Sequence, residues 1–160
     1  MNILCTALAY LTIHTHQIWP SLLADLTSNL NQEVEQVLCV MRTLKYMAND
    51  CDNDSIVVSD TTKTSFYAFL DSRARKEVFK EILEFWTISL QFKTITVDQK
   101  QEDVLKRAII DTFTAWLKLA LPNEVFEALL PENPTLIELV FCEVKSKSDE
   151  NLSASVSCIE

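Results

Sequence analysis

The residues that could bind a metal ion or take part in acid–base chemistry are few in this sequence of 160 residues. Asp50, Asp52 and Asp54 have the spacing that opens an EF-hand calcium loop. Such a loop also needs glycine at its sixth position and a bidentate glutamate at its twelfth, where this chain has Ser55 and Thr61. We therefore interpret the three aspartates as part of a solvated acidic loop that binds no calcium.

The histidines and cysteines do not suggest a catalytic centre. His14 and His16 are two residues apart, so on a helix they point to different sides and cannot chelate one metal ion well. A cysteine nucleophile would need a histidine base, and Cys5 is the candidate nearest to these histidines. The five cysteines are widely spaced and form no CxxC pair, which indicates mostly buried free thiols in a reducing compartment. We predict no catalytic residue, cofactor or metal, and therefore a protein that is not an enzyme.

One group of charged residues could contact a partner. Glu77, Glu81 and Glu84 have the i, i+4, i+7 spacing of an acidic stripe on one helix. The stripe is either a solvated face or a contact surface for a basic partner. The formal net charge of −9 agrees with both interpretations. Because this charge repels nucleic-acid phosphates and anionic lipids, we predict no direct nucleic-acid binding and no membrane insertion.

The composition indicates the elements that must position these residues. The chain has no glycine and four prolines, and 48% of its residues are apolar. Phosphate loops, dinucleotide-binding fingerprints and tight β-hairpins need glycine at positions of positive φ. Its absence therefore argues against those architectures and favours an all-α chain of helices joined by polar loops.

Apolar residues recur at helical spacing along the chain. The predicted helices cover residues 2–14, 19–30, 32–49, 65 or 72 to 92, 101–120 and 135–147. The apolar stripe of the third predicted helix comprises Val34, Val37, Leu38, Met41, Leu44 and Ala48. At the end of the chain, Leu152, Val156 and Ile159 predict that a further helix begins to bury an apolar face.

Between these helices, residues 50–64 are predicted to form a loop, although 55–64 could also be a short helical lead-in. The tryptophans Trp19, Trp86 and Trp116 are expected in the core. The helices form consecutive pairs, 2–14 with 19–30, 32–49 with 72–92 and 101–120 with 135–147, as in HEAT repeats. Residues 1–160 are thus predicted to be a single α-solenoid region of HEAT-like antiparallel helix pairs, and the apolar segments at both ends predict truncation at both.

Three segments carry a resemblance to a known family. They are Ala7–Leu11 followed by Trp19 and Leu22-Leu23, Phe113–Leu117 followed by Leu121-Pro122 and Val125-Phe126, and Leu136–Val144 followed by Asn151–Cys158. In this order and spacing the chain resembles the N-terminal half of an importin-β-type nuclear transport receptor (karyopherin). Within that superfamily it most resembles the branch that contains transportin-SR.

The resemblance implies a HEAT superhelix several times longer than this chain, present in nucleus and cytoplasm. It also implies that the partners are the Ran GTPase and protein cargo, which could be basic or arginine–serine-rich. No Ran-contact or cargo residue is assigned by position. Two alternatives remain open at this point. One is an α-solenoid scaffold unrelated to transport, and the other is a secreted helical bundle, to which the apolar run from Ile3 to Ile13 would give a signal-like start.

Overall fold

The computed structural model describes residues 2–19, 21–22, 25–26, 34–52, 58–69, 99–118, 131, 134–145 and 149–159. Over these ranges the secondary structure is helical, without strands. The helices are α1 (Asn2–Thr15), α3 (Val34–Asp52), α4 (Asp60–Phe69), α6 (Gln99–Lys118), α8 (Pro134–Glu143) and α9 (Asp149–Ile159). The all-α prediction is confirmed, and four of the predicted helices begin within two residues of their observed starts.

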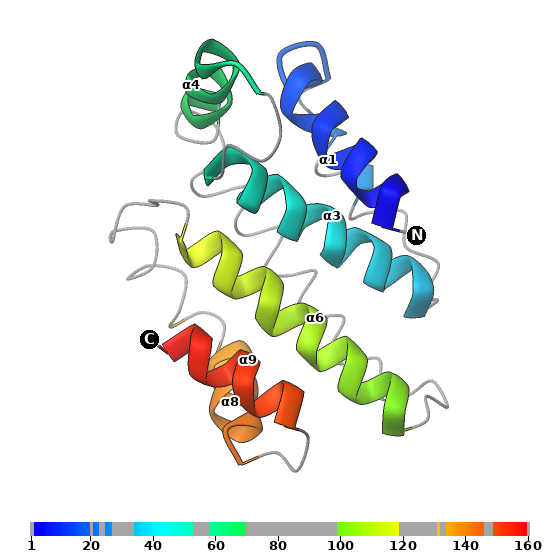
Figure 1. Ribbon diagram of the computed structural model, residues 1–160, viewed down its shortest axis with the longest axis vertical. Coiled ribbons are helices and arrows are strands. Elements are labelled where there is room, and N and C mark those ends of the chain that lie inside the picture. The colour runs from blue at the N-terminus through cyan, green and yellow to red at the C-terminus, as the bar shows by residue number, and fades with distance from the viewer. Residues whose placement is uncertain are drawn as a thin grey trace.

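Four of the helices form one layer. Helices α1, α3, α6 and α9 lie side by side and run in the same direction (Figure 1), and each contacts the next. Helix α8 packs on α9 from behind this layer, and α4 packs against α1. Neighbours in one layer can run parallel only if the intervening chain returns outside it, as in a solenoid of stacked helix pairs. The predicted HEAT-like α-solenoid architecture is therefore confirmed.

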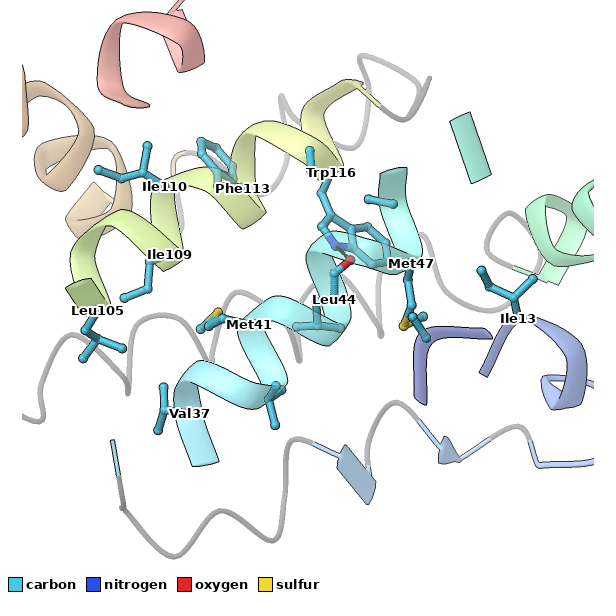
Figure 2. Close-up of a cluster of buried hydrophobic side chains, with 14 of the residues drawn as sticks. Ile13, Val37, Met41, Leu44, Met47, Leu105, Ile109, Ile110, Phe113 and Trp116 are labelled. Carbon is cyan, nitrogen blue, oxygen red and sulfur yellow. Dashed lines mark hydrogen bonds between the residues drawn. The ribbon is translucent and has the colours of Figure 1, made fainter. Parts of the chain in front are cut away.

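Helix α3 lies in the middle of the core. Met41, Leu44 and Met47 are fully buried, and side chains of α1 and α6 pack on either side of them (Figure 2). Val40 and Thr43 fall outside the predicted apolar stripe and are also buried. The reason is that α3 has a neighbour on each side, so a wider part of its surface is covered than an amphipathic stripe implies.

Two hydrogen bonds set the position of α6 along α3. The Thr112 hydroxyl donates to the main-chain oxygen of Met41 at 2.9 Å and lies 2.7 Å from the Ala108 oxygen in its own helix. The Trp116 indole N–H donates to the main-chain oxygen of Leu44 at 3.0 Å, and Figure 2 shows the ring directed at that residue. Because a buried indole N–H needs an acceptor, sliding α6 along α3 would cost these bonds.

The loop predicted over residues 50–64 is too long. Helix α3 continues to Asp52, and α4 begins at Asp60. The hydroxyl of Ser59 accepts a hydrogen bond from the Thr62 N–H at 3.2 Å, and Asp60 places a carboxylate in the first turn. This N-cap starts a helix in a serine- and threonine-rich segment of weak helix propensity, so the helical lead-in is the correct alternative for residues 60–64.

The buried face predicted for the last helix is wrong. Val156 and Ile159 are 40% and 53% exposed, whereas Asn151 and Ser155 are buried. Ser155 is small enough to let α9 approach α6 closely, and the Asn151 amide donates to the Glu143 carboxylate at 3.0 Å. The small volume of Ser155 and the hydrogen bond from Asn151 to α8, and not apolarity, therefore distinguish the buried face of α9.

The expectation for the tryptophans is correct for one of them. Trp116 is buried in the core, as predicted, and Trp86 lies outside the described residues. Trp19 is 46% exposed, which contradicts the prediction. Its indole N–H donates to the Asp25 carboxylate at 2.7 Å, so the polar end of the ring is satisfied at the surface without a core position.

Candidate interaction groove

The acidic stripe predicted from the sequence lies outside the described part of the chain. Glu77, Glu81 and Glu84 all fall within residues 70–98, which the structure does not describe. Their role as a partner-binding face therefore stays a prediction. The described helices present a different surface feature, which the sequence did not indicate.

A groove of about 610 Å³ crosses α3, α6 and α9. It is lined by basic, acidic, apolar and neutral polar side chains: Arg42, Lys45, Lys100 and Arg107; Asp103, Asp111 and Glu150; Tyr46, Val104 and Ala108; Thr112 and Asn151. The lining residues of α6 recur every three or four positions, so they form one stripe along that helix. Parallel stacking places this stripe between the polar sides of α3 and α9.

Two ion pairs cross the groove from helix to helix. Lys45 Nζ lies 2.7 Å from Asp111 Oδ2 and joins α3 to α6, and Arg107 pairs with Glu150 to join α6 to α9. All four side chains are partly exposed, and such pairs contribute about 0–1 kcal/mol each. The groove holds four basic side chains and three carboxylates, so it carries a positive excess in a protein whose net charge is −9.

A second polar cluster fastens α8 and α9 to α6. Lys106 Nζ lies 3.0 Å from Glu102 Oε1 and 3.1 Å from Glu143 Oε1, and Asn151 donates to the other Glu143 oxygen. Burial lowers the pKa of Lys106, but the hydrogen bonds that its ammonium group donates to Glu102 and Glu143 outweigh this, so the pKa is raised above its usual 10.5. Because Glu143 is buried, this cluster holds α9, and with it one wall of the groove, in place.

The two histidines lie at the C-terminal end of α1, His14 in its last turn and His16 in the turn that follows. His14 is exposed, with its ring centroid 4.1 Å from that of Tyr10. His16 is buried, with Nδ1 at 2.7 Å from the main-chain oxygen of Ile13 and Nε2 at 3.1 Å from the Ser65 hydroxyl. Since a carbonyl oxygen only accepts, Nδ1 carries the proton and the Ser65 hydroxyl donates to Nε2. His16 thus connects α1 to α4 and has a structural role.

The cysteine beside the histidines faces another thiol. Cys5 is buried, and its sulfur lies 3.5 Å from that of Cys39 on α3. Burial, and then the hydrogen bond with Cys5, raise the pKa of the Cys39 thiol, so it is protonated at neutral pH and a poor nucleophile. Both thiols therefore act as packing groups between α1 and α3.

The described ranges contain no group of three or more histidine, cysteine, aspartate or glutamate side chains that could hold a metal ion. Asp50 and Asp52 belong to the last turn of α3, and Asp54 lies outside the described residues. Among the described helices, none is long and apolar enough to cross a membrane.

A layer of parallel stacked helices with a charged groove across it defines the class of this molecule. It is an α-solenoid, in which helices of successive repeats line one continuous surface. Over residues 1–159 the sequence matches the family described as exportin 1-like protein, and the chain belongs to that family of nuclear transport receptors built from importin/exportin-β-type helical repeats. Comparison with curated proteins found no match, and comparison with solved structures found none either.

Proposed function

We propose that this chain is a nuclear transport receptor, or a region of one, that binds the GTP form of Ran together with protein cargo and performs no catalysis. The observation that carries the proposal is the family match over residues 1–159, to which the parallel layer of α1, α3, α6 and α9 adds the expected architecture. Family membership favours this role over a scaffold unrelated to transport and over a secreted helical bundle.

Nucleotide-dependent binding of Ran tests the proposal. Ran loaded with a non-hydrolysable GTP analogue would be titrated against the immobilised receptor by biolayer interferometry, with Ran–GDP as the matched control. We expect binding in the GTP form and much weaker binding in the GDP form. Equal binding of both forms, or none by the full-length protein, would refute a transport role.

The finer placement beside transportin-SR is also a proposal, supported by the three sequence segments that resemble that branch. Such a receptor would carry basic or arginine–serine-rich cargo, and the stripe of Glu77, Glu81 and Glu84 would attract it. Changing these residues to glutamine should weaken binding of an arginine–serine repeat peptide. The control is Glu35→Gln with Glu138→Gln, which removes charge from exposed positions elsewhere.

We also propose that the protein is present in both nucleus and cytoplasm and moves between them. A fluorescent fusion followed by photobleaching of the nucleus would test this. Nuclear fluorescence should recover from the cytoplasmic pool. The recovery should be faster than that of a free fluorescent protein of matched size, which enters the nucleus only by passive leakage. A fusion that stays in one compartment would contradict the proposal.

A further inference from the structure

The charged groove across α3, α6 and α9 is the surface of the described helices with a chemistry opposite to that of the whole protein. The chain carries a net charge of −9, which predicts basic partners. The groove nevertheless contains both arginines of the described residues, Arg42 and Arg107, together with Lys45 and Lys100. Arginine binds carboxylates through two parallel hydrogen bonds, so its presence here favours an anionic ligand.

Three basic side chains of the groove, Lys45, Lys100 and Arg107, are accessible to such a ligand. Lys100 is exposed and forms no ion pair with any described residue. Lys45 and Arg107 do have carboxylate partners, but these pairs are partly exposed and contribute little. A carboxylate of a partner can therefore share or replace Asp111 and Glu150 at small cost.

The groove also offers apolar contact between its charges. Val104 is 40% exposed, and Ala108 and the ring of Tyr46 lie along the same cavity. A cavity of about 610 Å³ has room for a few side chains of an extended peptide. The combination therefore fits alternating acidic and apolar residues, the acidic ones toward the basic side chains and the apolar ones toward Val104.

We propose that this groove binds an extended acidic peptide segment of a partner protein, with apolar residues between its carboxylates. The proposal does not depend on Ran or on transport, because binding needs only the peptide and the groove. A nucleic acid is the less favoured anion. Its many phosphates would meet the surrounding net negative surface, whereas a short peptide places its charges within reach of the four basic side chains.

The test is fluorescence anisotropy of the 160-residue chain with a labelled peptide of glutamate–leucine repeats. A lysine–leucine peptide and an oligothymidylate are the comparison ligands. We expect the acidic peptide to bind best and its affinity to fall with added salt. Stronger binding of the basic peptide, stronger binding of the oligothymidylate, or no binding of the acidic peptide would each overturn the proposal.

Variants assign the binding to the groove. The double change Arg42→Gln with Lys100→Gln should weaken binding of the acidic peptide about tenfold. Lys118→Gln with Lys145→Gln removes the same charge from exposed positions outside the groove and should change binding little. Equal losses in the two double variants would mean that the peptide responds to net charge alone, which would overturn the proposal.

A gain of affinity provides a test that misfolding cannot imitate. Asp103 lines the groove and accepts a hydrogen bond from Gln99 at 3.2 Å, without an ion pair to a described residue. Asp103→Asn removes its negative charge at constant size and should tighten binding of the acidic peptide about two- to threefold. An unchanged or weaker affinity in this variant would contradict the proposal.

Discussion

The two sides of helix α6 stack on their neighbours with different chemistry. Toward α3, the contact consists of buried apolar side chains such as Leu44 and Ile109, and Thr112 and Trp116 donate to main-chain oxygens. Toward α9, the buried residues of that helix are Asn151 and Ser155, and the Glu143 carboxylate of α8 bonds both Lys106 of α6 and Asn151 of α9. Both are contacts between consecutive helices of one layer, so parallel stacking does not require a single kind of interface.

This difference predicts that the stability of the two contacts responds differently to pH and salt. Among the described residues, the buried part of the α3–α6 contact has no ionised group, and the Lys45–Asp111 pair at its surface is partly exposed, so the stability of this contact should depend little on pH or salt. At the α6–α9 end of the layer, Lys106 of α6 pairs with Glu143 of α8, and these charges are favourable only while both are ionised and close together. The α6–α9 end of the layer should therefore be the one whose stability solution conditions change.

The largest effect is expected from removing the central aromatic side chain of the α3–α6 contact. Trp116→Ala should lower the free energy of unfolding by about 3–5 kcal/mol, because it leaves a cavity in the core. Urea denaturation followed by circular dichroism measures this. Trp19→Ala is the matched control and should cost about 0–1 kcal/mol, since the Trp19 ring is half exposed. A similar cost for both tryptophans would mean that α3–α6 is not the core of the layer.

The next largest effect is expected at the α6–α9 end of the layer, where Lys106 of α6 pairs with Glu143 of α8. Lys106→Met leaves the buried Glu143 carboxylate without its cation and should cost about 1–3 kcal/mol. Adding Glu143→Gln, which removes the uncompensated charge, should recover part of this loss. Lys118→Met, at an exposed position of the same helix, should have almost no effect in the same urea titration. Failure of Glu143→Gln to recover any stability would argue against a charge-based contact.

A smaller effect is expected from removing one interhelical hydrogen bond. Thr112→Val keeps the shape of the side chain and deletes the bond to Met41, at a cost of about 0.5–1.5 kcal/mol. Thr15→Val makes the same change on α1, where the exposed hydroxyl bonds to the Leu11 oxygen one turn earlier, and should be nearly neutral. If the two valine variants unfold at the same urea concentration, the Thr112 bond does not stabilise the contact.

The smallest effect concerns alkaline pH. The pKa of Lys106 is raised in the folded protein above its usual 10.5, so its contribution is fully present below pH 10.5 and is lost as pH rises through the folded pKa. The stability difference between the natural protein and Lys106→Met should accordingly be constant near neutral pH and shrink above pH 10.5. The difference between the natural protein and Thr112→Val should stay constant over the same range, and a parallel loss in both would contradict the assignment.

The sequence predicted the α3–α6 half of the molecule well and the α6–α9 half poorly. Met41, Leu44, Phe113 and Trp116 recur at helical spacing, so apolarity alone identifies the faces that meet. On α9 the same criterion selected Val156, which is exposed, because the fit between Asn151 and Glu143 is not a periodic signal.

The groove was not predicted for a related reason. Lys45 and Asp111 are 66 residues apart in sequence and meet only once α6 has a fixed position along α3. Taken separately, Arg42 and Lys45 on one helix and Lys100 and Arg107 on another resemble ordinary solvated faces. The basic residues were visible in the sequence, three positions apart on α3 and seven positions apart on α6, but the register between the helices was not.

The two hydrogen bonds that fix the register of α6 against α3 depend on side-chain identity in only one of the two helices. The acceptors for Thr112 and Trp116 are main-chain oxygens of α3, and every amino acid supplies one. Mutation at positions 41 and 44 can change volume but cannot delete an acceptor, whereas almost any mutation at 112 or 116 deletes a donor. In a library of random variants, selection for folding should conserve the residue types at positions 112 and 116. At positions 41 and 44 it should conserve only the size of the side chain. The relative position of the two helices is thus encoded by the residue types of α6.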